Sequence, residues 1–406
     1  MYNVRKRMTL AFILGLVILC QAAIDIYLPS LPQMAHHFGA SVDQAQMTVS
    51  IYLFGFGGSQ IFYGPLADRF GRMPVLLFGL PLFVISSFGI VWAPTINFIL
   101  LFRFFQGAAV GAASVCARAI MRDVFTSEEL PVVSSYMSMG WAFVPILAPT
   151  LGGIIQQHFG WKYSFILLGL LGLILTGWLV ICVGETGRNR STGLSLTRVT
   201  KEYCGLFKES EFKKNLLLLV LLYSVFSCVN VAGPVIFQQQ YNVSAIQYGW
   251  IMLVVASGYF VGSFLNSRLL LRMYPVRIIG MGAFLLFIAA LGGLLIELSG
   301  GATVSTLMCS LFVAYLALGL IFANAISASL RPFSKLAGIA SSMYGVILFC
   351  SGAVVSAGYA LFFESCSTNL AYALCLISGL MLFSYWFFFS KKIRRDKCRH
   401  FLSRSA

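Results

Sequence analysis

Long runs of apolar residues, separated by short polar connections, make up most of the chain. A helix needs about 20 apolar residues to cross a bilayer, and twelve runs of roughly this length can be placed. They lie at residues 8–29, 43–65, 74–93, 95–119, 131–156, 161–184, 215–238, 244–269, 276–298, 302–326, 337–363 and 366–390. The runs are continuously apolar, whereas the strands of a membrane barrel would be short and alternating. The pattern predicts an all-α membrane protein with 12 transmembrane helices.

The twelve runs fall into two groups of six. Residues 1–184 hold the first six, and residues 215–390 hold the second six. The polar segment 185–214, which carries charges of both signs, predicts a cytoplasmic linker, and residues 391–406 predict a basic cytoplasmic tail. Two six-helix units on either side of a linker are typical of internally duplicated transporters. We therefore predict two pseudo-symmetric six-helix halves.

Composition and charge agree with this prediction. Hydrophobic residues make up 59% of the 406 residues and charged residues 10%, compared with about 25% charged residues in a soluble domain. The net charge of +15 is unevenly distributed, because Lys and Arg cluster in every second connection and at both termini, and the remaining connections carry only Lys162. Basic connections face the cytoplasm, so both termini are predicted to be cytoplasmic. The membrane topology accounts for the positive net charge, so no nucleic-acid partner is expected.

A charged turn stands between the second and third apolar runs. Its sequence is GPLADRFGR, and it contains Gly64, Asp68, Arg69, Gly71 and Arg72. Proline and glycine interrupt helices, so the turn is predicted where the chain leaves the bilayer. The spacing resembles the loop between helices two and three of the major facilitator superfamily of secondary transporters, with Met73 where a second basic residue is common. The alternative is a solvated loop whose arginines only orient the chain.

Two ionisable residues lie inside predicted spans, where a charged side chain costs about 2.5–3.5 kcal/mol. At about 1.5 Å per residue, Asp25 lies ~25 Å from the cytoplasmic end of the first span, and Arg103 lies ~12 Å below the outer end of the fourth. The long side chain of Arg103 could span the difference in depth and reach Asp25. A carboxylate whose partner or water access changes with conformation suits proton coupling, so Asp25 is a candidate for proton coupling or substrate binding, with Arg103 as its modulator. The alternative for Asp25 is a structural acid. The alternative for Arg103 is a side chain that extends to the lipid headgroups at the outer face of the membrane.

The fourth span carries two further motifs. It reads Arg103-Phe-Phe-Gln106-Gly107, which resembles the Arg-x-x-Gln-Gly motif of helix four in the same superfamily. It ends Ala-Arg-Ala-Ile-Met-Arg-Asp, which contains Arg118, Arg122 and Asp123. This ending, together with the segment Asp25-x-Tyr27-Leu-Pro29-x-Leu-Pro32, is similar to the Bcr/CflA group of drug:proton antiporters.

The fifth span contains Pro145, Pro149, Gly152 and Gly153. Proline removes a backbone hydrogen bond and glycine permits close packing, so this helix is expected to kink and to pack tightly. The pattern resembles the antiporter motif of helix five, with Ala148 in place of a glycine. That motif is associated with exporters rather than with uptake systems.

The resemblance implies a transporter whose halves rock about a central site. It implies proton-coupled export of drugs or other small amphipathic compounds across the inner membrane of a bacterium, by a monomer. It also implies that Asp68, Arg72 and Arg122 form a cytoplasmic latch against the other half in the outward-open state. The predicted cytoplasmic gate comprises Gly64, Asp68, Arg69, Gly71, Arg72, Arg118, Arg122 and Asp123. The candidate cavity-lining residues are Tyr27, Tyr52, Gln106, Trp141, Tyr223 and Asn230.

Other function classes find little support in the sequence. It contains no Walker motif, metal-ligand set or Ser/His/Asp arrangement, so neither an enzyme nor a cofactor or metal site is predicted, and the proton is the expected coupling ion. One alternative on the same fold is a dedicated exporter of one metabolite or siderophore. The others are a receptor or scaffold without transport and an uptake symporter, which the fifth-span motif disfavours.

Overall fold

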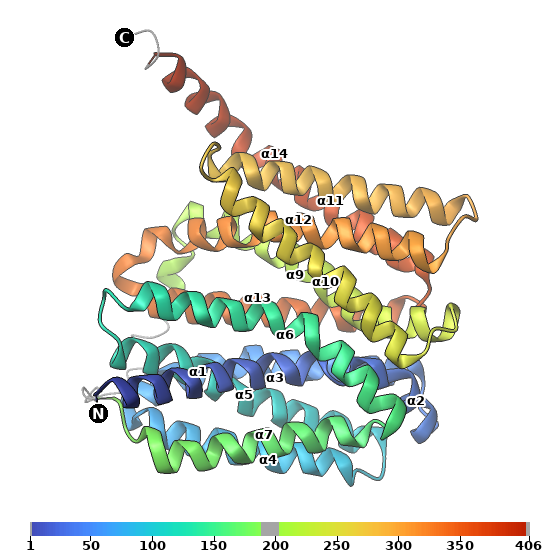
Figure 1. Cartoon of the computed structure of the whole chain (residues 1–406). Coiled ribbons are helices and arrows are strands. Elements are labelled where there is room, and N and C mark those ends of the chain that lie inside the picture. The colour runs from blue at the N-terminus through green and yellow to red at the C-terminus, as the bar shows by residue number, and fades with distance from the viewer. Residues whose placement is uncertain (1, 188–202, 403–406) are drawn as a thin grey trace.

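The computed structural model describes residues 2–187 and 203–402, with side chains described for residues 4–187, 203–333 and 340–389. Every regular element in these residues is helical (Figure 1). The first group comprises α1 (Tyr2–Asp25), η1 (Leu28–Ser30), α2 (Leu31–Phe38), α3 (Val42–Phe70), α4 (Arg72–Val91), α5 (Ile96–Val124), α6 (Leu130–His158), α7 (Lys162–Trp178) and η2 (Leu179–Val183). The second comprises α9 (Ser210–Val235), η3 (Ile236–Gln240), α10 (Ala245–Leu269), α11 (Pro275–Leu298), α12 (Val304–Leu330), η4 (Arg331–Leu336), α13 (Ala337–Phe362) and α14 (Ser367–Leu402).

The described residues contain twelve long helices, one at each predicted span. Eleven segments are long and apolar enough to cross a membrane, and α3 is the helix that falls short of this composition. Its polar side chains Gln46, Thr48, Ser50 and Gln60 are buried, because α3 packs between α5 of its own group and α13 of the other. A helix that is covered by protein does not need an apolar surface toward lipid, so α3 can be more polar than its neighbours.

The two groups form two halves, and α1–α7 occupy the lower part of Figure 1 while α9–α14 occupy the upper part. The packing of the first half is repeated in the second, since α3 packs on α5 as α10 packs on α12, and α4 packs on α7 as α11 packs on α14. The two halves meet where α3 contacts α13 and where α10 contacts α6. The predicted all-α fold with two pseudo-symmetric halves is confirmed.

Glycine permits the closest helix contacts at matching places in the two halves. A Cβ atom at Gly107 of α5 would collide with the carbonyl of Tyr52 in α3. A Cβ atom at Gly319 of α12 would collide with the carbonyl of Tyr259 in α10. Each glycine therefore lets one backbone pack directly against the next.

Several helix boundaries differ from the prediction by a few residues or more, among them the ends of α1 and α14. The first span was expected to reach residue 29, but α1 ends at Asp25. A proline ring clashes with the carbonyl four residues earlier, which for Pro29 is that of Asp25. At the other end of the chain, α14 continues to Leu402, so much of the predicted tail at 391–406 extends this helix beyond the bundle (Figure 1). Residues 188–202 of the predicted linker and 403–406 of the tail lie outside the described residues.

Successive long helices run in opposite directions, which gives the bundle two distinct ends. We call the end that holds the start of α1 the basic end, and the opposite one the distal end; they lie at the left and right of Figure 1. The basic end includes residue 71 and the connections 125–129, 270–274 and 331–336. The distal end includes α2 and the connections 92–95, 159–161, 241–244, 299–303 and 363–366. Among the described residues, nearly all basic residues outside the spans therefore lie at the basic end.

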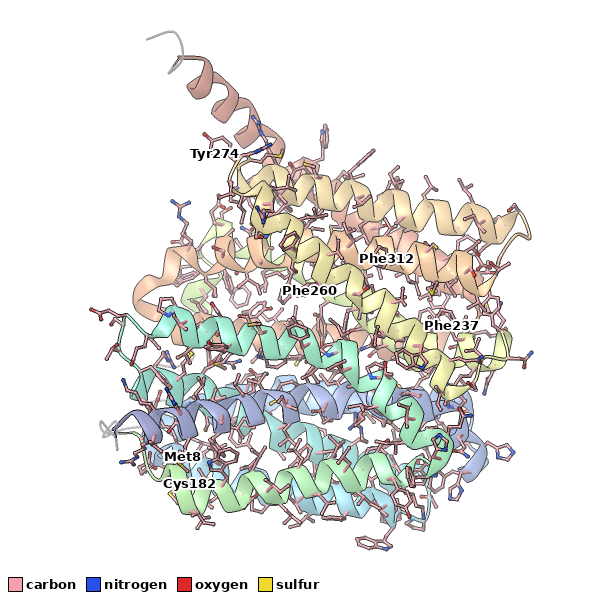
Figure 2. The ribbon with its side chains drawn as sticks, in the orientation of Figure 1. Met8, Cys182, Phe237, Phe260, Tyr274 and Phe312 are labelled. Carbon is pink, nitrogen blue, oxygen red and sulfur yellow. The ribbon has the colours of Figure 1, made fainter. Side chains whose placement is uncertain are left out.

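Apolar side chains fill the interior of both halves (Figure 2). The halves also touch through side chains near the middle of their helices. The ring centroids of Phe143 in α6 and Phe260 in α10 are 5.7 Å apart, and Figure 2 labels Phe260. The boundary between the halves thus combines polar and aromatic contacts.

Candidate functional site

Hydrogen bonds close the two halves against each other toward the distal end. Among the described residues, six hydrogen bonds cross between the halves, and all of them lie in the distal part of the bundle. Gln46 of α3 donates to the Val231 carbonyl at 2.9 Å and to the Ser365 hydroxyl at 2.6 Å. The hydroxyl oxygens of Ser50 and Ser356 are 2.7 Å apart.

Asp25 takes part in this contact between the halves. Its side chain is 1% exposed. Gln21 Nε2 donates to its Oδ2 at 2.9 Å, and Asn230 Nδ2 of α9 donates to its Oδ1 at 3.3 Å. Asn230, a candidate for cavity lining, is therefore the link between Asp25 and the second half. In the described part of the chain, no ion pair involves Asp25.

Arg103 is fully buried nearby, within the first half. Its Nη1 donates to the Ala23 carbonyl at 3.0 Å and to Gln106 Oε1 at 2.6 Å, and its Nε donates to the Thr48 carbonyl at 3.3 Å. The guanidinium lies 4.3 Å from the ring centroid of Tyr27 and 4.1 Å from that of Tyr52.

The expected contact between Asp25 and Arg103 is thus not formed in this conformation. The Ala23 carbonyl belongs to the last turn of α1, whose carbonyls lack helical donors and carry partial negative charge. Because α1 ends early, Arg103 can bind this free helix end instead of the carboxyl group. The rings of Tyr27 and Tyr52 and the side chain of Gln106 are fully buried around it, so these three cavity candidates lie in packed interior here.

The charged turn forms a network inside the first half at the basic end. Arg72 Nη1 lies 3.1 Å from Asp68 Oδ1, and Arg72 Nε lies 2.9 Å from Asp123 Oδ2. The carboxylate of Glu185 accepts from the backbone N–H groups of Arg72 at 3.0 Å and Met73 at 3.2 Å, at the start of α4. These contacts join α3, α4, α5 and the segment after α7, and no described contact of the network reaches the second half.

The other gate candidates surround this network without joining the two halves. Gly71 has a φ of +103°, which favours glycine, and a Cβ atom there would collide with Glu185. Arg122 Nε donates to the Arg118 carbonyl at 3.3 Å. The guanidinium of Arg69 lies 5.1 Å from the Phe70 ring centroid, and a Cβ atom at Gly64 would meet no atom within 4 Å. The cross-half latch is a prediction for another conformation.

Arg118 is not part of the charged network. Its Nη2 donates to Gln60 Oε1 at 2.9 Å, and its Nη1 donates to Ser114 Oγ at 3.1 Å. The sequence grouped it with the gate because Arg122 and Asp123 follow closely. In the structure its head group lies deeper in the bundle, beside α3.

The antiporter-like segment of α6 makes the second contact between the halves. Thr150 Oγ1 donates to the Gly249 carbonyl of α10 at 3.0 Å. A Cβ atom at Gly153 would collide with the Ala245 carbonyl of α10, and one at Gly152 would collide with the Ile26 carbonyl just after α1. Pro145 and Pro149 lie within the same helix. The glycines therefore allow α6 to touch both α10 and the chain that follows Asp25.

An aromatic cluster lies at the middle of the boundary. The Phe349 ring of α13 has its centroid 4.1 Å from Phe56, 5.5 Å from Tyr223 and 6.5 Å from Trp141. The cavity candidates Trp141 and Tyr223 therefore meet through Phe349. Sequence reasoning missed Phe56 and Phe349, since no local pattern distinguishes them among 36 phenylalanines.

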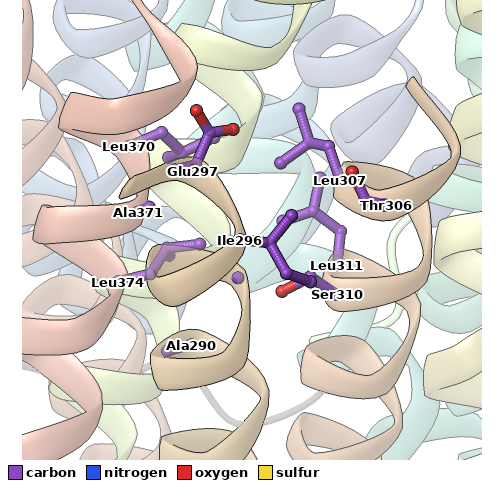
Figure 3. A pocket seen from close by; sticks show the side chains of 11 residues that line it. Ala290, Ile296, Glu297, Thr306, Leu307, Ser310, Leu311, Leu370, Ala371 and Leu374 are labelled. Carbon is purple, nitrogen blue, oxygen red and sulfur yellow. The ribbon is translucent and has the colours of Figure 1, made fainter. Parts of the chain in front are cut away.

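Two small cavities lie away from the boundary. One, of about 20 Å³, lies between α11, α12 and α14 and is lined in part by Glu297 (Figure 3). Glu297 Oε2 accepts a hydrogen bond from the Ser367 hydroxyl at 2.9 Å. The other, of about 260 Å³, lies on the first half at the distal end and includes His36, Trp161 and Lys162. Both volumes are below the range of about 300–1,000 Å³ that is typical of drug-sized sites. Within the residues that the structure describes, no group of three His, Cys, Asp or Glu side chains could hold a metal ion.

Comparisons with known proteins agree with the sequence motifs. A family model described as "Major Facilitator Superfamily" matches residues 13–357. The chain is 32% identical over 342 residues to "Multidrug resistance protein MdtL" of Shewanella oneidensis, and the aligned region covers 84% of this chain and 85% of the relative. It is also 24% identical over 403 residues to "Bicyclomycin resistance protein homolog" of Haemophilus influenzae, and the aligned region covers 96% of this chain and 99% of the relative. The predicted resemblance to the superfamily and to its Bcr/CflA-type members is confirmed.

The fold is also similar to solved structures. A partially occluded inward-open structure of the xylose transporter XylE from E. coli matches with a TM-score of 0.73 and 14% identity, over 95% of this chain and 97% of that one. A D-xylose-proton symporter matches with a TM-score of 0.71 and 17% identity, over 94% and 97%. At this identity the likeness concerns the fold alone.

Proposed function

The chain belongs to the major facilitator superfamily of membrane transporters, and we propose that it is a proton-coupled antiporter that exports drugs or other small amphipathic compounds. Its relatives named as multidrug and bicyclomycin resistance proteins support drug export over a dedicated exporter of one metabolite or siderophore. On the positive-inside rule, the basic end faces the cytoplasm of a bacterium. The protein acts in the cytoplasmic membrane as a monomer without a cofactor.

The position of Asp25 carries this proposal. Its buried carboxyl group contacts a neutral amide from each half, Gln21 and Asn230. A carboxylate that loses water without gaining a cation is costly, and binding a proton removes that cost. When the halves separate at the distal end, Asn230 moves away and water reaches Asp25, which favours the ionised form. Proton binding is thereby linked to closure of the distal end.

Antiport follows from this link. In the described conformation the distal end is closed, and the protonated form of Asp25 fits the site. Substrate that enters from the basic end exchanges for this proton, after which the distal end opens and releases the substrate outward. Asp25 then takes up a proton from outside and the cycle repeats. Arg103, which is held at the Ala23 carbonyl two residues before Asp25, supplies a nearby positive charge for the ionised form.

The test is proton release from acid-loaded inside-out vesicles, followed with a pH-sensitive dye while drugs and hydrophobic compounds are added singly. We expect substrate-triggered proton efflux from the wild type and none from Asp25→Asn, because the amide binds no proton. Asp43→Asn is the matched control, since Asp43 lies in the first turn of α3 at the same end. Full efflux from Asp25→Asn would exclude Asp25 as the coupling site.

A further inference from the structure

Arg118 is a cation within α5 that no carboxylate neutralises in the described residues. It lies six residues before the end of the helix at Val124, or about 9 Å along the axis. An arginine at this depth often extends its side chain to the membrane surface. Arg118 does the opposite, because it binds Ser114, one turn deeper, and Gln60, which is fully buried. A charge directed into the bundle without a counterion indicates a functional role.

The guanidinium of Arg118 lies at the boundary between the two halves. Gln60, its partner, faces α13, and a Cβ atom at Gly345 of α13 would lie 2.7 Å from Gln60 Oε1. Gln60 and Ser114 are buried, whereas Arg118 remains partly exposed. Its head group therefore belongs to the surfaces that part when the halves rock.

The aromatic cluster lies one helical turn from this cation. Phe56 precedes Gln60 by four residues on α3, and Phe349 follows Gly345 by four residues on α13, so both rings lie about 6 Å along the helices from the Arg118 contact. A flat apolar group that reaches this cluster would have Arg118 within reach of a short substituent. The boundary thus offers an apolar surface next to one fixed positive charge.

Charge at the boundary favours an anion over a cation. Within the membrane-spanning helices, the described interior holds Arg103 and Arg118 against one acid, Asp25, which lies on the distal side. Arg118 uses two of its five N–H donors for Gln60 and Ser114. The free donors match the paired oxygens of a carboxylate.

We propose that Arg118 binds the anionic group of the transported compound, so that the preferred substrate is an amphipathic molecule with an aromatic body and a carboxylate. The inference rests on the proposed export function and specifies its substrate class. The aromatic body lies against Phe56, Phe349, Trp141 and Tyr223, and the carboxylate accepts from Arg118. Arg118 is then a specificity residue of the transport site and not only a part of the gate.

The experiment compares two matched probes, radiolabelled 2-naphthylacetate and its neutral amide, in equilibrium binding to the full-length protein in detergent. We expect the wild type to bind the carboxylate more tightly than the amide. Arg118→Gln should weaken carboxylate binding by about ten- to a hundredfold, as expected for lost charge-assisted hydrogen bonds, and leave amide binding unchanged. Arg118→Lys should keep part of the preference for the carboxylate probe, because lysine keeps the positive charge but lacks the paired N–H donors of the guanidinium group.

Arg272→Gln, in the exposed turn after α10, removes the same charge elsewhere and should change neither affinity. The proposal is overturned if the wild type binds the two probes equally or prefers the amide. It is also overturned if Arg118→Gln weakens both probes alike, which would make the residue structural. If Arg118→Gln is not monodisperse, the proposal is tested by two other results. These are the preference of the wild type for the carboxylate probe and the partial loss of that preference in Arg118→Lys. No proton gradient is present, so failure here is distinct from failure of the Asp25 test.

Discussion

The two ends of the bundle are held together in opposite ways. At the distal end, six hydrogen bonds join the two halves, and none of them is an ion pair in the described residues. At the basic end, the three ion pairs of the described residues join helices of the first half to one another. Among the described residues, the polar contacts between the halves are thus hydrogen bonds without ion pairs, and the ion pairs lie within one half.

This difference fits the demands of alternating access. Contacts between the halves must break in every cycle, and a neutral hydrogen bond that exchanges with water has a net value of only about 0.5–1.5 kcal/mol. Such bonds leave two conformations close in free energy, so that a proton or a substrate can shift the balance. Ion pairs within one half need not break when the two halves rock.

A substitution at Gly153 should have the largest effect on this balance. In Gly153→Val the new side chain meets the Ala245 backbone of α10 only when the distal end is closed. Overpacking costs about 1–3 kcal/mol, so we expect the equilibrium to shift toward the distal-open state by roughly ten- to a hundredfold. Hydrogen exchange in residues 241–249 should become faster, and transport should fall.

The matched control is Gly177→Val in α7, where a Cβ atom would meet no atom within 4 Å. It should leave both exchange and transport unchanged. If Gly153→Val exchanged like the wild type in residues 241–249, α6 and α10 would not form the distal closure.

A smaller shift is expected when one polar side chain is removed from the distal contacts. Gln46→Ala loses two hydrogen bonds to the second half, to Val231 and to Ser365. At about 0.5–0.7 kcal/mol for each bond, the loss should favour opening by roughly five- to tenfold. Gln44→Ala is the comparison, because the Gln44 side chain accepts from Ser41 of its own half. Faster exchange of residues 241–249 in Gln46→Ala alone would support the contrast between the ends. Equal effects of the two substitutions would contradict it.

The sequence predicts these regions to different extents. The twelve helices and the charged turn follow from local patterns, and the contact of Arg72 with Asp68 spans four residues. The distal contacts do not follow in this way, since Asp25 and its partner Asn230 are 205 residues apart. No periodicity selects one asparagine among several polar groups in the second half.

The interpretation of Arg103 shows a further limit. Its depth agreed with a contact to Asp25, but a depth along one axis does not determine which neighbour a side chain reaches. The helix end created by Pro29 offers carbonyls at the same level, and Arg103 binds one of them, that of Ala23. This outcome depends on where α1 stops, and predicted boundaries are uncertain by a few residues.

The smallest effect is expected for a charged pair at the basic end. Lys6 of α1 lies 2.6 Å from Glu129 at the start of α6, and the backbone N–H of Thr126 also donates to this carboxylate. The hydrogen bond from Lys6, followed by that from Thr126, lowers the pKa of Glu129 below its ordinary value of 4.5. The stabilisation by ionised Glu129 is therefore present above this value and is lost as the pH falls through the lowered pKa.

Glu129→Gln should lower the unfolding temperature slightly at neutral pH. The difference from the wild type should shrink as the pH falls below 4.5 and disappear below the lowered pKa of Glu129. High salt should reduce it as well, because the pair is partly exposed. Glu128→Gln, at the exposed neighbouring residue, should show neither dependence. Since the pair joins two helices of one half, exchange at residues 241–249 should not change. A change at the distal end in Glu129→Gln would mean that the charged contacts also control opening, and the contrast between the two ends would fail.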